Sequence, residues 1–129
     1  MTSPAVRCRV AGAAVEPALG PWDLGTWTGL PLTEVPDLAR WRADPGYDDH
    51  GGESLLALER RVAGLLSRWH ARPGRWVAVT HAAVIRAAVL QALHAPATSA
   101  WDLDVSPGSV SELHATKTGW RVVRVNARA

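Results

Sequence analysis

His81 lies where the character of the sequence changes. Residues 76–80 form a short apolar run with β-branched members, which predicts a buried strand, and residues 83–93 have the spacing of a helix. The carboxyl end of a buried strand, just before a helix, is where open α/β sheets place ligands, and the first N–H groups of the helix favour an anion. A histidine there can bind a phosphate oxygen or stabilise negative charge, although a histidine that merely caps the helix fits the same spacing.

Arg7 is the second residue that could bind an anion. It follows Ser3 and Pro4, which suit the N-cap and first turn of a helix over the first fourteen residues. A forked guanidinium on such a helix can hold two oxygens of one phosphate. An arginine on a solvated helix face is the alternative interpretation.

The remaining histidines have no metal-ligand spacing, so we expect no metal and no cofactor. They are His50 in a loop, His70 and His94 at helix ends, and His114 in a strand. The single cysteine, Cys8, excludes an internal disulfide and fits a reducing cytoplasm, and a structural thiol is the simplest interpretation of it.

The composition is that of one ordered domain spanning residues 1–129. Apolar residues make up 47% and charged residues 20%, and the formal net charge is only +2, which together argue against disorder. The pI of 9.3 is a weak indication of nucleic-acid binding, because the arginines are scattered and several lie beside acids. No apolar stretch is long enough to span a membrane and no signal peptide is visible, so we expect a cytoplasmic location and no membrane partner.

Helical and strand patterns alternate along the chain, which predicts an α/β or α+β layered domain. Few strands are visible for such a fold. After the first helix, we expect a Gly-, Pro- and Trp-rich loop over 15–32, then one or two short helices over 33–41, broken by Pro36, and a polar loop over 43–52. A long helix is expected over 53–71, followed by the strand 76–80 and the helix 83–93. The chain should end in a hairpin of the strands 110–115 and 120–125.

Five segments, in order along the chain, resemble motifs of one family. TSPAVRCRVAG resembles an SPxxRxxxTA helix, LGPWDLGTWTG an LxExxxGxWxG segment, GGESLLALERRV a GES helix, VAVTHAAVIRAAV a late histidine motif, and SPGSVSELHATKTGWRVVRVNA a pair of final strands. Over essentially its whole length, the chain therefore resembles the histidine phosphatase superfamily, the phosphoglycerate-mutase-like phosphatases.

The resemblance implies a three-layer α/β/α sandwich, here without the first two strands and the helix between them. In the family these strands lie inside the sheet, and their removal leaves unpaired backbone groups beside an opened core. We therefore expect a homodimer or a complementing chain rather than a stable monomer.

The resemblance also implies a reaction, the hydrolysis of a phosphate monoester. A histidine in an R-H-G motif attacks phosphorus, and two arginines and the late histidine surround the phosphoryl oxygens. Carried onto this sequence, Arg7 is the second arginine and His81 the late histidine. The implied partner is a phosphorylated small molecule.

The residue that protonates the leaving group departs from the family pattern. Pro21 occupies the position of the family's glutamate and has no proton to give. Asp23, two positions later, and Glu53 of the GGES segment are the two candidates. Each also has a structural interpretation, Asp23 as the cap of a turn and Glu53 as a carboxylate in the first turn of a helix.

No R-H-G sequence occurs in the chain, so the nucleophile is absent from it. The first hypothesis is a phosphatase that is inactive as this isolated chain and obtains its first strands from an upstream start or a second polypeptide. The alternative is a non-catalytic phosphate-binding protein, a pseudo-phosphatase that dimerises. Nucleic-acid binding ranks last.

Overall fold

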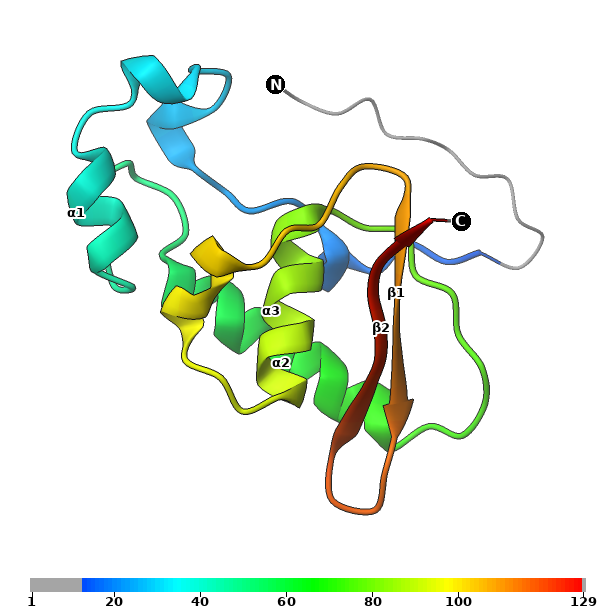
Figure 1. The fold of residues 1–129 in the computed structure, drawn as a ribbon. Helices are drawn as coiled ribbons and strands as arrows, with labels where there is room; N and C mark the ends of the chain where they lie inside the picture. Colours follow the sequence, from blue (N-terminus) through cyan, green and yellow to red (C-terminus); the bar gives the residue numbers. More distant parts are fainter. Residues whose placement is uncertain (1–12, 129) are drawn as a thin grey trace.

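The structure is a computed structural model that describes residues 13–128 (Figure 1). Arg7, Cys8 and the helix expected around them lie outside the described residues. The helices and strands are α1 (Leu38–Ala43), α2 (Leu55–His70), α3 (Ala82–Ala92), β1 (Ser109–Ala115) and β2 (Trp120–Arg128), with short 3-10 turns η1 (Pro17–Leu19), η2 (Gly25–Trp27), η3 (Leu32–Glu34) and η4 (Ala97–Asp102).

Helix α2 confirms the strongest pattern in the sequence. Ser54 is its N-cap, and the Ser54 hydroxyl accepts a hydrogen bond from the Ala57 N–H at 3.0 Å. The apolar spacing predicts one face formed by six residues, of which Trp69 is half-buried and five are buried: Leu55, Leu58, Val62, Leu65 and Leu66. The helix starts two residues later than expected, so Glu53 precedes the cap and does not lie in the first turn.

Helix α3 packs on α2 and forms the main core with it (Figure 1). Val84 and Ala87 of α3 lie against the leucine face of α2. Two hydrogen bonds also join the helices: the Gln91 side-chain amide donates to the Glu59 carbonyl at 2.7 Å and to the Glu59 carboxylate at 3.0 Å. The predicted helix over 83–93 is confirmed within one residue at each end.

The predicted hairpin is also confirmed, and it packs against α3 (Figure 1). Strands β1 and β2 are antiparallel, and Thr116 donates its N–H to the Gly119 carbonyl across the turn at 2.8 Å. Leu113 and Trp120 pack from the hairpin onto the core between α2 and α3. These two strands form the whole sheet within residues 13–128.

The buried strand expected over 76–80 is wrong. The segment has no strand conformation, and its side chains are exposed: 56% for Trp76, 90% for Val77 and 65% for Val79. An apolar run becomes a buried strand only between neighbouring strands that accept and donate its backbone hydrogen bonds. No strand of the described chain pairs with this run.

The Gly-, Pro- and Trp-rich region forms turns, as expected, and encloses an aromatic cluster. Trp27, Trp41 and Tyr47 are buried together, and η3 and α1 are separate short helices on either side of Pro36. The loop over 43–52 is less polar than its composition predicts, because Tyr47 is buried and His50 is only 1% exposed. None of the helices in residues 13–128 has the length and apolarity needed to cross a bilayer.

Candidate active site

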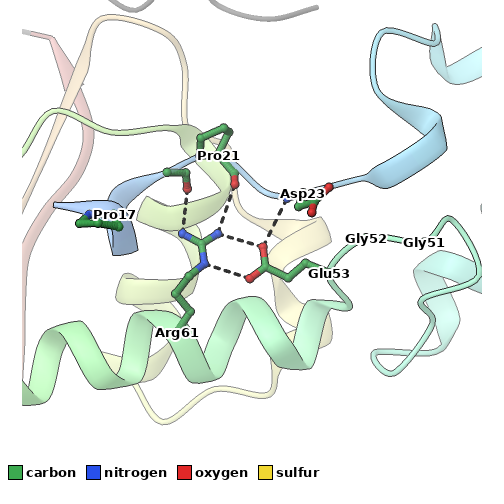
Figure 2. A pocket seen from close by; sticks show the side chains of 8 residues that line it. Pro17, Pro21, Asp23, Gly51, Gly52, Glu53 and Arg61 are labelled. Carbon is green, nitrogen blue, oxygen red and sulfur yellow. Dashed lines mark hydrogen bonds and ion pairs between the residues drawn. The ribbon is translucent and has the colours of Figure 1, made fainter. Parts of the chain in front are cut away.

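Arg61 of α2 is the centre of a hydrogen-bond network that the sequence analysis missed (Figure 2). Its Nε donates to Glu53 Oε2 and its Nη2 to Glu53 Oε1, both at 2.9 Å. Nη1 donates to the carbonyls of Ala18 at 2.8 Å and Gly20 at 2.9 Å, and Nη2 also donates to that of Pro21 at 3.3 Å. Since a guanidinium has five N–H groups, these five bonds use all of them.

This network fixes the loop before η2 to the start of α2. The loop carbonyls lie 40 to 43 residues before Arg61 in the sequence. The only local signal was the spacing of Glu53 and Arg61, eight residues apart, which places them two turns apart on one side of a continuous helix. That signal does not indicate the carbonyl partners.

The structure brings the two candidate proton donors, Asp23 and Glu53, together. The Glu53 N–H donates to the Asp23 carbonyl at 2.7 Å, and the Asp23 N–H donates to Glu53 Oε1 at 3.3 Å. The Asp23 side chain is exposed, and its Oδ1 accepts the Gly25 N–H at 2.9 Å. Asp23 therefore caps a turn with Oδ1, and its Oδ2 has no hydrogen-bond partner among residues 13–128.

Two glycines allow the two loops to meet backbone to backbone. A Cβ on Gly52 would meet the carbonyl oxygen of Asp23 and the amide nitrogen of Gly25. A Cβ on Gly25 would meet the His50 carbonyl oxygen, and Gly25 has a φ of +54°, in the left-handed region. The contact between these loops positions Asp23 beside Glu53.

An open pocket lies over this network (Figure 2). The carboxylates of Asp23 and Glu53 line the pocket, and so does the Arg61 guanidinium. The lining residues are Pro17, Gly20, Pro21, Asp23, Gly51, Gly52, Glu53 and Arg61.

His81 is the N-cap residue of α3, as its position in the sequence predicted. Its carbonyl accepts the N–H groups of Val84 and Ile85, both at 3.1 Å, while its imidazole makes no capping hydrogen bond. His81 thus occupies the capping position through its backbone, while its ring makes no hydrogen bond to the start of α3. The N–H groups of Ala82 and Ala83, which precede Val84 and Ile85, have no intrahelical acceptor, and free N–H groups at a helix start favour an anion.

Thr80, the residue before His81, is hydrogen-bonded to the loop that carries Asp23. The hydroxyl of Thr80 donates to the Leu19 carbonyl at 2.6 Å. His81 thus follows directly on a residue anchored to the loop that Arg61 holds, although His81 itself does not line the pocket. The structure brings Asp23 and Glu53 together and leaves His81 at the neighbouring helix start.

Comparison with known proteins identifies the family. Residues 3–128 match the histidine phosphatase superfamily (branch 1). The chain therefore belongs to the histidine phosphatase superfamily, and its mixed helix and strand structure is part of the phosphoglycerate-mutase-like α/β fold.

Two solved structures are similar to the chain, both with 25% sequence identity and a TM-score of 0.73. One is the mycobacterial glucosyl-3-phosphoglycerate phosphatase in its native form, and the other is mycobacterial hydrolase 2. The match covers 89% of this chain in both cases, but only 65% of the first structure and 60% of the second. A comparison with curated proteins gives no match.

Proposed function

We propose that this chain forms the phosphate-binding part of a histidine-phosphatase site, with Arg7 and His81 as ligands of the phosphoryl oxygens. The observation that carries the proposal is the position of His81, in the family's late histidine motif, at the first turn of α3 with its ring free of any capping bond. Family membership and the phosphatase similar to it support phosphate monoesters as the substrate class.

The chemistry proposed for these residues is charge stabilisation. A guanidinium and an imidazole N–H can each donate to equatorial oxygens of the phosphoryl group, which carry the charge in the transition state. Asp23 is the proton donor that fits best, because its side chain is exposed and its Oδ2 has no hydrogen-bond partner among the described residues. Both oxygens of Glu53 already accept hydrogen bonds from Arg61, so Glu53 holds the loop instead.

We infer that the 129 residues alone do not complete the reaction. The proposed reaction transfers the phosphoryl group to a histidine of an R-H-G motif, and this sequence contains none. The nucleophile would come from a preceding segment or from a second polypeptide.

A non-catalytic phosphate-binding protein is the second candidate function. Pro21 stands at the family's glutamate position, and 76–80 has no strand partner within the described residues, so an unaided site is incomplete. A homodimer or a complementing chain would supply the cover for this segment. Both proposals give Arg7 and His81 the same role and differ only in turnover.

Activity and binding assays on the 129-residue chain separate the candidates. We expect no hydrolysis of p-nitrophenyl phosphate and no acid-labile phosphohistidine, together with a rise in Tm when vanadate is added. Turnover by the purified chain would contradict the inference of inactivity. A salt-dependent affinity for RNA or DNA without any vanadate effect would instead favour the nucleic-acid hypothesis.

A further inference from the structure

In the part of the chain that the structure describes, the pocket at Asp23 and Glu53 offers acceptors of hydrogen bonds and almost no free donors. We propose that it binds the leaving-group part of the substrate through the donors of that group, hydroxyl or ammonium, and that it excludes a second anionic group. The proposal rests on the proposed function, which puts the phosphoryl group at His81, and it assigns the class of leaving group that the pocket at Asp23 accepts.

The backbone donors of the 51–52 turn are already used. The Gly51 N–H donates to the Asp48 carbonyl at 2.8 Å. The Gly52 N–H donates to the His50 ring nitrogen Nδ1 at 2.9 Å. Although these glycines line the pocket, neither amide is free to bind an anion there.

The opposite side of the pocket has no free backbone donor either. Pro17 and Pro21 have no N–H group, and the Gly20 N–H donates to the Pro17 carbonyl at 3.0 Å. The Asp23 N–H donates to the Glu53 carboxylate, and the Glu53 N–H donates to the Asp23 carbonyl. Free backbone N–H groups of glycines can bind phosphate, but the glycine N–H groups that line this pocket already donate to acceptors within the protein.

Among residues 13–128, Arg61 is the one cation that lines the pocket, and all of its N–H groups are already hydrogen-bonded. Its five N–H groups bond to the Glu53 carboxylate and to three loop carbonyls. Binding a ligand carboxylate or phosphate through Arg61 would require breaking bonds that hold the loop in place. The guanidinium therefore balances Glu53 and is not available to an incoming anion.

The polar group of the pocket that can still bind a ligand is a hydrogen-bond acceptor with negative charge, the Asp23 carboxylate. Two carboxylates and one guanidinium line the pocket, so the part of it formed by residues 13–128 carries a net negative charge. Within residues 13–128, Asp23 Oδ2 has no hydrogen-bond partner, whereas Oδ1 accepts the Gly25 N–H. A hydroxyl or an ammonium group can donate to this oxygen, and a carboxylate would be repelled by it.

A pair of small phosphate esters tests the proposal on the 129-residue chain. O-phosphoethanolamine presents an ammonium group and 3-phosphoglycerate a carboxylate, and ethanolamine alone tests the pocket without phosphate. In ¹H–¹⁵N NMR titrations we expect O-phosphoethanolamine to bind about tenfold more tightly than 3-phosphoglycerate, the effect of one charge-assisted hydrogen bond. It should shift the amides of Gly51 and Gly52, and ethanolamine should shift the same amides.

Asp23→Asn removes the charge and adds a donor, so it should abolish the preference for O-phosphoethanolamine. Asp104→Asn, at an exposed aspartate that does not line the pocket, is the matched control and should keep it. Equal affinity for both esters, or no shift at Gly51 and Gly52 with any of the three probes, would overturn the proposal. Pocket shifts with ethanolamine but no shift of the Ala82 and Ala83 amides with either ester would leave the pocket proposal standing and refute the phosphate site.

Discussion

The carboxyl group of Glu59 lies at the contact between α2 and α3, where it meets Gln91. Burial raises its pKa above the ordinary value of 4.5, and the hydrogen bond from Gln91 opposes this rise only in part. One carboxyl oxygen, Oε1, is buried without a partner among the described residues. The ionised form is thus the costly one in the folded protein.

Glu59→Gln should therefore stabilise the protein at pH 7. Because the folded-state pKa is raised, the wild type loses stability as pH rises from about 4.5 through the folded-state value, and the glutamine variant does not. Thermal unfolding from pH 3.5 to 8 should show a gain in Tm for the variant at pH 7 that vanishes at the acid end. Glu34→Gln, at an exposed glutamate, is the control, and a wild-type Tm that rises over this window relative to the variant would contradict the prediction.

The pKa of Glu16 is shifted in the opposite direction to that of Glu59. Its bond to Arg68 lowers the pKa of the Glu16 carboxyl below 4.5. Arg68→Ala should return this pKa toward its ordinary value, which ¹³C NMR of the side-chain carboxyl would detect. An unchanged pKa in the variant would show that the ion pair does not persist in solution.

At the scale of elements, the decisive contact is the one between the loop at 18–25 and the start of α2. Arg61 holds three carbonyls and one carboxylate, and its side chain is mostly buried with that of Glu53. Arg61→Ala leaves these acceptors without their donors, and we expect a loss of about 2 kcal/mol or more in unfolding free energy. Chemical denaturation would measure it, with the exposed Arg60→Ala as the control expected to change stability by less than about 0.5 kcal/mol. If both variants lost the same unfolding free energy, the hydrogen bonds of Arg61 would not hold the loop to α2.

The approach of Gly52 to Asp23 and Gly25 gives a matched pair of glycine variants. Gly52→Ala places a methyl group against backbone atoms that cannot yield independently, and it should destabilise the protein by more than about 1 kcal/mol. Gly64→Ala, in an exposed position of α2 with open space around it, should stabilise by roughly 0.5–1 kcal/mol. If both substitutions changed the stability in the same direction, the close contact between the loops would be disproved.

At the scale of the whole molecule, the parts predicted correctly are those that local patterns determine. The helices α2 and α3 follow from apolar spacing, and the hairpin follows from two strand-like runs on either side of a turn. The segment 76–80 was mispredicted because burial of a strand depends on neighbours that its own sequence does not specify. Arg61 was missed for a similar reason, since its partners are carbonyls more than 40 positions away that have no side-chain signature.

The same distinction predicts how substitutions in the two regions differ. Val62 is fully buried between the helices, so Val62→Ala should cost about 2 kcal/mol. Val77 is 90% exposed, so Val77→Ser should change the stability of the isolated chain by less than about 0.5 kcal/mol. Urea denaturation of both variants tests this, and a large loss for Val77→Ser would mean that another copy or chain covers the segment in solution.

The central claim is that Arg7 and His81 bind the phosphoryl group of a histidine-phosphatase site. Isothermal titration of vanadate into the 129-residue chain and its His81→Ala and Arg7→Ala variants tests it most directly. We predict measurable binding to the wild type and a loss of about tenfold or more in each variant, since each change removes one charge-assisted hydrogen bond. Affinities that are equal in all three proteins, or no binding to any of them, would contradict the claim.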